Sequence, residues 1–127
     1  MSNINVPIFV ESRYRVSRKK IKNVVFDVLA KKGVVGPAEV SVAIVGDRKM
    51  RELNKKYREL DKSTNVLSFC QMEGEGATPR GTLFLGDVVV SYPQVIKEAA
   101  SENMLVDDKV CELVEHGLMH LLGEHHE

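Results

Sequence analysis

The sequence predicts an α+β fold in a single domain, residues 1–127, with a four-stranded mixed β-sheet packed against about four helices. Four short apolar segments rich in β-branched residues are interspersed with four segments whose apolar residues recur at helical spacing. Their order combines βα crossovers with a strand pair that only a loop separates, so parallel and antiparallel neighbours are both expected. A chain of 127 residues builds one hydrophobic core but not two.

The predicted strands cover residues 4–10, 39–45, 65–69 and 82–91. In the first strand, Pro7 lacks a backbone N–H, which indicates either a sheet edge or a bulge. The last strand is long and apolar but contains Gly86-Asp87, a pair that fits either a bulge beside a pocket or an exposed edge. Residues 71–81, rich in Gly and Glu, are predicted to form a loop.

Three of the four predicted helices have clear start or stop signals. The first covers about residues 16–32 and ends before Gly33. Asp47 is predicted to be the N-cap of the second, which runs through Tyr57. Pro93 lies in the first turn of the third, where its missing N–H costs nothing.

The last predicted helix begins at Asp107 or Asp108, where the helix dipole favours a negative charge. Its buried stripe is expected to consist of Val110, Leu113, Val114, Leu118 and Leu121. At 100° per residue, His116 and His120 lie about 40° apart on one flank of that stripe. We therefore expect both imidazoles at the rim between core and solvent, where a pocket can open.

Composition narrows the class of protein. No apolar run approaches the roughly 18 residues of a membrane span, and the N-terminus has no basic and apolar regions typical of a secretory signal. Two cysteines do not make a disulfide framework, so a reduced, cytoplasmic setting is expected.

Charge is divided unevenly along the chain. Residues 1–62 hold 15 of the 18 Lys and Arg but only 7 Asp and Glu, whereas residues 63–127 hold 3 and 11. This division indicates a polyanionic partner for the basic part. An equally good interpretation is that the two halves fold together and their charges mix on the surface.

All four histidines lie in the last twelve residues, which read His116-Gly117-Leu118-Met119-His120-Leu121-Leu122-Gly123-Glu124-His125-His126-Glu127. Imidazoles four residues apart on a helix are about 5–6 Å apart at Cβ and reach one ion. A left-handed turn at Gly123 would bring up a third imidazole, from His126 or from His125. Three histidines leave a fourth position for water, as in catalytic zinc sites. We predict one Zn²⁺ per chain, although imidazoles also suit Cu, Fe and Ni.

The spacing H-x3-H-x2-G-x2-H is that of the metzincin zinc peptidases, with one difference. Those enzymes place a general-base glutamate directly after the first histidine, where this chain has Gly117. Without that base the chain is not expected to be an ordinary peptidase. A purification remnant or frayed surface residues would also explain a terminal histidine cluster, but neither explains an amphipathic helix that ends at a glycine.

Three segments together resemble the YbeY family of bacterial rRNA maturation factors. The histidine segment is similar to the family signature HGxLHLxGYDH. The segments Leu53-Asn54 to Tyr57-Arg58 and Ser63 to Phe69 resemble its LNxxYR…PTDVLSF stretch, and Leu85 to Ser91 resembles its LGDIxIS strand. The resemblance covers residues 53–126, and the first fifty residues match only in their order of elements.

The resemblance implies a zinc-dependent, single-strand-specific endoribonuclease that acts in 3′-end maturation of small-subunit (16S) rRNA and in ribosome quality control. It also implies that His116, His120 and His126 are zinc ligands. Arg58 matches the family's functional arginine, and a guanidinium there would hold a phosphodiester and stabilise transition-state charge. From the residues alone, Arg58 also fits a solvated basic helix face. The implied partners are single-stranded RNA and the small ribosomal subunit with its proteins, and we expect a monomer without a membrane partner.

The chain departs from the family pattern at Glu124-His125, which replace Tyr-Asp. Either residue is a candidate for the displaced proton-transfer role, and Asp87 is a candidate partner for a histidine N–H. Two other hypotheses remain open at this stage. One is a metal-dependent hydrolase of a peptide or small molecule, and the other is a non-catalytic ribosome-associated factor in which a structural metal fixes the C-terminus.

Overall fold

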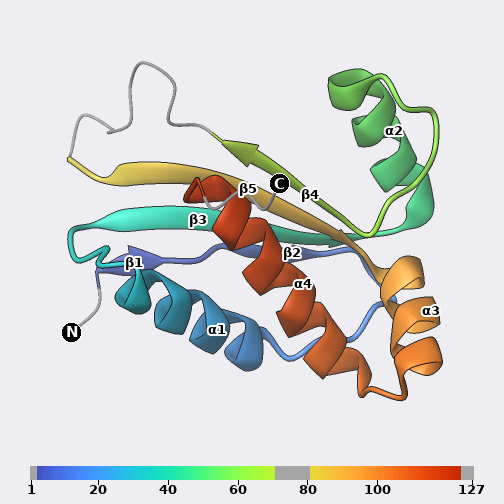
Figure 1. Ribbon diagram of the computed structural model, residues 1–127, viewed down its shortest axis with the longest axis horizontal. Helices are drawn as coiled ribbons and strands as arrows, with labels where there is room; N and C mark the ends of the chain where they lie inside the picture. The colour runs from blue at the N-terminus through green and yellow to red at the C-terminus, as the bar shows by residue number, and fades with distance from the viewer. Residues whose placement is uncertain (1–2, 71–80, 124–127) are drawn as a thin grey trace.

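The computed structural model describes residues 3–70 and 81–123, and its helices and strands form an α+β fold, as predicted. In chain order they are β1 (Ile4–Asn5), β2 (Ile8–Val10), α1 (Arg18–Lys31), β3 (Ala38–Val45), α2 (Asp47–Arg58), β4 (Val66–Cys70), β5 (Leu83–Ser91), α3 (Tyr92–Glu102) and α4 (Val106–Leu121). Figure 1 shows α1 and α4 side by side over one face of the sheet.

The sheet is mixed, as predicted, but it has five strands instead of four. β1 and β2 both pair with β3 in parallel, β3 pairs with β5 in parallel, and β4 forms an antiparallel edge on β5. The extra strand arises because the predicted strand over residues 4–10 is interrupted at Val6-Pro7. β1 and β2 nevertheless keep one register against β3, so Pro7 marks an edge strand and not a bulge.

The bulge lies in β5, at Gly86. Glu39 pairs with Phe84 and Val40 with Gly86, so Leu85 is the additional residue. Gly86 has φ +140°, and a Cβ there would meet the carbonyl oxygen of Phe69 on β4. Only glycine combines this backbone angle with so close an approach of the neighbouring strand.

Two helix starts differ from the predictions. Gly46, not Asp47, is the N-cap of α2, and Asp47 is the first helical residue, with its side chain engaged elsewhere. The helix α4 begins at Val106, before both aspartates, which therefore lie within its first turn. The ends were predicted correctly at Gly33 and Gly123, which have φ of +79° and +83° and follow the C-cap residues Lys32 and Leu122 of α1 and α4.

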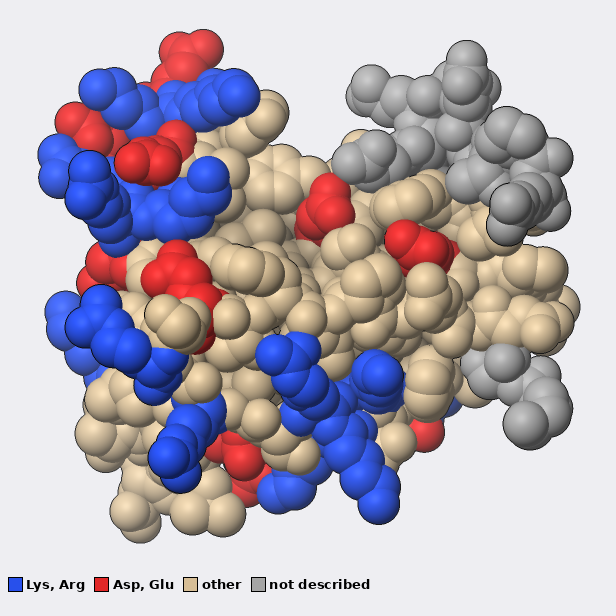
Figure 2. All heavy atoms as spheres, turned by 180° about the vertical axis from the view of Figure 1, so that it is seen from behind, with Lys and Arg blue, Asp and Glu red and all other residues tan. Residues whose placement is uncertain are grey.

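Alternation along the strands separates the core into two parts. Even-numbered residues of β3 face α1 and α4, as do Val88 and Val90 of β5 and, before the bulge, Leu85. They form the main cluster, which includes all five residues of the predicted α4 stripe. On the other face a smaller cluster consists of Val45, Met50, Leu67 and Val89, against which Leu53 of α2 packs. Figure 2 shows this side of the molecule.

Gly117 is the point at which α4 lies closest to the sheet. It is buried, and a Cβ built there would lie 2.7 Å from Val88 Cγ1 and 3.0 Å from Ser68 Oγ. Any side chain would push α4 away from β4 and β5. The position where metzincins carry their general base is thus a packing contact, which explains why no glutamate follows His116 in this chain.

Both halves of the chain contribute to one sheet, so the uneven distribution of charge along the sequence does not divide the molecule in two. The helix α2 nevertheless keeps six Lys and Arg against two acidic residues. Among residues 3–70 and 81–123, no helix is both long and apolar enough to cross a bilayer.

Gly117→Ala should lower the free energy of unfolding by about 1–2 kcal/mol, because overpacking against Val88 outweighs the gain in helix propensity. The measurement is urea denaturation followed by circular dichroism. Gly36→Ala is the matched control, since a Cβ at Gly36 meets no atom within 4 Å. Equal stability of the two variants would show that α4 does not depend on this contact.

Candidate functional site

The helix α4 presents two imidazoles on adjacent turns. The ring centroids of His116 and His120 are 4.9 Å apart, with 64° between the ring planes, and both residues are exposed. They flank the buried residues Gly117 and Leu121, so the contact with the sheet fixes the direction in which the rings project. The predicted position at the rim of the core is confirmed.

Strand β4 holds α4 in place beside these rings. Ser68 Oγ donates a 2.9 Å hydrogen bond to the carbonyl oxygen of Gly117, one residue after His116. Since Ser68 and Val88 face the same helix, β4 and β5 together define where the first histidine lies. Ser68 therefore positions α4, a role that the VLSF segment did not reveal.

The structure brings Arg58 to the same cavity as the two histidines. This histidine cavity, of about 540 Å³, is lined by Arg58, His116, His120 and, among others, Asn65, Ser68 and Cys70. Arg58 is the last residue of α2, and Glu59 follows it in the left-handed conformation with φ 59°, which ends the helix. Within the described residues its guanidinium forms no ion pair, so it is available to a ligand.

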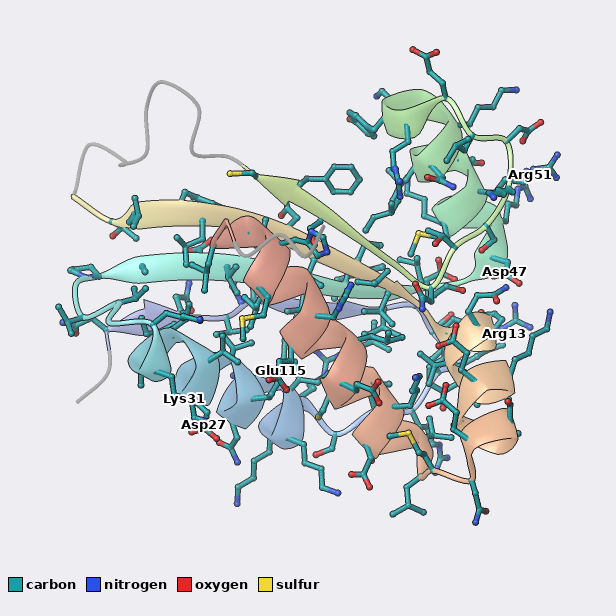
Figure 3. The ribbon with its side chains drawn as sticks, viewed as in Figure 1. Arg13, Asp27, Lys31, Asp47, Arg51 and Glu115 are labelled. Carbon is teal, nitrogen blue, oxygen red and sulfur yellow. The ribbon has the colours of Figure 1, made fainter. Side chains whose placement is uncertain are left out.

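The start of α2 is anchored by Asp47. Its Oδ1 accepts hydrogen bonds from Ser63 Oγ (2.7 Å), Ser91 Oγ (2.8 Å) and Gln94 Nε2 (3.1 Å). Figure 3 shows Asp47 between α2 and α3. Partial burial by itself would raise the pKa of Asp47, but the three hydrogen bonds outweigh it and lower the pKa below its usual value.

The segment that follows α2 is tied back along the helix. Buried Asn54 donates from Nδ2 to the carbonyl oxygen of Lys62 at 2.9 Å, and Arg51 Nε lies 2.6 Å from Asp61 Oδ1. These bonds connect α2 to the start of β4. Arg58 and the β4 residues of the histidine cavity are therefore parts of one continuous unit.

Asp87 does not lie beside His116 and His120. Val88 faces α4 at Gly117, so its neighbour Asp87 points to the opposite face of the sheet, toward α2. There it lines a groove with Arg58 and Phe69. The alternation of β5 thus places Asp87 on the face away from His116 and His120, and its role as a partner for a histidine N–H stays a prediction, since His125 and His126 lie outside the described residues.

Two of the predicted metal ligands, His116 and His120, lie beside each other in the described part of the chain. The predicted ligand His126, its rival His125 and the candidate Glu124 lie outside the described residues. Among residues 3–70 and 81–123, no three His, Cys, Asp or Glu side chains are grouped to hold a metal. The pair of imidazoles on adjacent turns nevertheless has the donor chemistry that Zn²⁺ requires.

Known proteins resemble the chain over nearly its whole length. A family model described as Endoribonuclease YbeY matches residues 8–127. The chain belongs to the YbeY endoribonuclease family. It is 39% identical to an endoribonuclease YbeY of Thermodesulfovibrio yellowstonii, covering 94% of this chain and 78% of that protein. With the endoribonuclease YbeY of Francisella philomiragia it shares 32% identity, over 99% and 80% of the two chains.

The fold of this YbeY-family chain has also been observed experimentally in a relative. A protein of Thermotoga maritima, whose structure was determined in solution, superposes with a TM-score of 0.59 at 25% identity. The match covers 96% of this chain and 75% of that protein. The family resemblance predicted from residues 53–126 is therefore confirmed, and it extends to the N-terminal elements.

The contacts of Asn65, which stands where the YbeY family has an aspartate, were not predicted from the sequence. Its Nδ2 lies 3.1 Å from Glu98 Oε2, and Glu98 in turn lies 3.4 Å from Lys109 Nζ. Lys109 is only 4% exposed and also binds Glu102 at 2.9 Å. Through this network α3 and α4 hold one wall of the histidine cavity. The one feature of the sequence that could have indicated this network is Lys109, a charged residue among the apolar positions of the last helix.

Asp47→Ala should destabilise this YbeY-family protein by about 2 kcal/mol at neutral pH, since three hydrogen bonds to a carboxylate are lost. The lowered pKa of Asp47 means that its contribution is complete above about pH 4 and disappears as pH falls further. Urea denaturation of both proteins between pH 7 and pH 3 measures the difference. Asp27→Ala is the control, because Asp27 is an exposed aspartate on α1. A stability difference that does not change with pH would contradict the stabilising role of the ionised Asp47 carboxylate.

Proposed function

We propose that this protein is a zinc-dependent endoribonuclease specific for single-stranded RNA, acting in 3′-end maturation of 16S rRNA and in ribosome quality control. Membership of the YbeY family supports a nuclease. The observation that carries the proposal is the histidine cavity itself, in which Arg58 from α2 and two imidazoles from α4 meet. A cation for phosphate beside a pair of metal-ligating side chains is the combination that phosphodiester hydrolysis needs.

Each side chain of the histidine cavity has a distinct role in the proposal. His116 and His120, with His126, would hold the metal through neutral imidazole nitrogens. A zinc ion held there would supply Lewis acidity toward a phosphoryl oxygen. Arg58 donates two parallel N–H bonds to non-bridging oxygens and stabilises the negative charge that grows on them during the reaction.

The surroundings of Arg58 support RNA over a peptide as the substrate. Lys55, Lys56 and Arg58 lie in the last turn of α2, which places three positive charges close together for a phosphate backbone. The space beside His116 that a peptidase would fill with its general base is taken by the sheet at Gly117. The proposal further includes action as a monomer in the cytoplasm, on the small ribosomal subunit and its proteins.

Cleavage of a labelled single-stranded RNA by metal-analysed protein, with and without chelator, tests the function. We expect cleavage that the chelator abolishes and that a duplex of the same sequence resists. Hydrolysis of peptides but not RNA would favour the alternative metal-dependent hydrolase. Stoichiometric metal without hydrolysis of either substrate would favour a structural metal in a ribosome-associated factor.

His116→Ala and His120→Ala should each reduce bound zinc from one ion per chain to a small fraction, because the remaining imidazoles no longer complete the site. Mass spectrometric metal analysis after dialysis provides the measurement. Cys111→Ala is the control: burial, followed by the charges of Asp107 and Asp108, raises the pKa of this thiol, which keeps it protonated. Full zinc occupancy in both histidine variants would refute the ligand assignment.

Arg58→Ala should lower the rate of RNA cleavage by about a hundredfold or more while leaving zinc content unchanged, since the arginine contacts phosphate and not metal. Arg48→Ala is the matched control, because Arg48 lies on the same helix with its side chain 97% exposed. A similar loss in both variants would mean that α2 contributes only general positive charge.

A further inference from the structure

A second concave surface lies on the face of the sheet opposite α4. This sheet groove, of about 790 Å³, has a floor that includes Ala43, Val89, Asp87 and Phe69, and a wall formed by Tyr57 and Arg58 of α2. Figure 2 shows this side hollowed beside α2, with Lys and Arg side chains along that helix. Its size is typical of sites that accept small organic groups.

Aromatic rings stand at the wall and floor of the sheet groove. Tyr57 is 56% exposed, and its ring packs edge-to-face with that of Phe69, with centroids 5.0 Å apart. Lys56 Nζ lies 5.2 Å from the centroid of Tyr57, so a cation accompanies the ring. A large exposed aromatic surface next to cations is the arrangement on which unpaired bases stack in proteins that bind single strands.

Charge determines which part of a nucleotide the sheet groove can accept. Its wall carries the guanidinium of Arg58, with Lys56 beside Tyr57, whereas its floor is largely apolar and includes Ala43, Phe69 and Val89. A phosphate at the wall would be attracted by these cations, whereas a phosphate on the apolar part of the floor would lose its hydration without gaining a partner. The base of a nucleotide therefore fits the floor, while its sugar-phosphate backbone lies along α2. An acidic peptide would share only the attraction to this helix, and an apolar peptide only the floor, whereas an unpaired nucleotide uses the cations, the floor and the aromatic rings together.

The sheet groove and the histidine cavity are two sides of one edge strand. Arg58, Leu67, Ser68 and Cys70 line both, because β4 is the last strand of the sheet and α2 ends beside it. A backbone held by Arg58 is thus within reach of either face. A nucleotide next to the phosphate at Arg58 can turn its base around β4 and into the sheet groove.

We propose that the sheet groove binds an unpaired nucleobase of the RNA substrate, stacked on Tyr57 and Phe69, while the scissile phosphate lies at Arg58 on the other side of β4. The inference rests on the proposed function and extends it by placing a base-binding subsite outside the histidine cavity. Paired bases cannot enter such a groove, so this subsite accounts physically for a preference for single strands.

Binding of a 2′-O-methylated, fluorescein-labelled oligoadenylate ten nucleotides long, measured by fluorescence anisotropy, tests the subsite without cleavage. Tyr57→Leu keeps apolar bulk but removes the aromatic face, and should weaken binding about tenfold. Tyr57→Phe should bind within about twofold of wild type. An abasic oligomer of equal length should bind as weakly to wild type as oligoadenylate does to Tyr57→Leu. Leu105→Ala is the control, because Leu105 is also exposed but lies at the N-terminal end of α4 and does not line the sheet groove.

Thermal unfolding of each variant separates lost contact from lost fold, since Tyr57 is more than half exposed and its replacement should leave the protein folded. Wild-type affinity in Tyr57→Leu, or equal affinity for the abasic oligomer, would overturn the base-binding subsite. Whether the wild-type protein cleaves unmodified RNA is measured in a separate assay. If chelator or Arg58→Ala abolishes cleavage while Tyr57→Leu binds oligoadenylate as tightly as wild type, the base-binding subsite is refuted and the proposed function stands. If wild type cleaves no RNA, the proposed function fails by itself.

Discussion

The contact between α4 and the sheet at Gly117 determines the geometry of the whole site. Because Gly117 has no side chain, the helix approaches Val88 and Ser68 closely enough for Ser68 to donate to its carbonyl oxygen. His116 and His120 then line the histidine cavity beside β4. The same close approach removes the space for a base after His116. One packing constraint thus orients the two imidazoles and leaves no room for the general base of the metzincins.

The edge position of β4 gives the protein two usable surfaces from one short strand. Successive side chains alternate, so Ser68 faces α4 and the histidine cavity while Leu67 and Phe69 face α2 and the sheet groove. A central strand would separate these surfaces by the full width of the sheet. At an edge they meet, and Arg58 stands where they do.

Local patterns in the sequence sufficed for most of the fold and for half of the site. The flank of α4 that carries His116 and His120 follows from helical periodicity, and Arg58 follows from the family resemblance. The face on which Asp87 lies could not be predicted, because it depends on which side of β5 receives α4. Likewise, the capping preference of aspartate favoured Asp47 as an N-cap, whereas three partners distant in sequence bind its carboxylate. Tertiary contacts decided both cases.

Because α2 is anchored at Asp47, a small change in the orientation of the helix there becomes a larger displacement at its other end. Arg58 lies at the opposite end, eleven residues and about 16 Å along the axis. A rotation of about 5° around the Asp47 end would displace the guanidinium by more than about 1 Å, a shift that costs on the order of a hundredfold in rate when it affects a substrate-holding group. The hydrogen bonds of Ser63, Ser91 and Gln94, together with the bonds that Arg51 and Asn54 make further along α2, therefore determine how precisely the Arg58 guanidinium is placed a full helix length away.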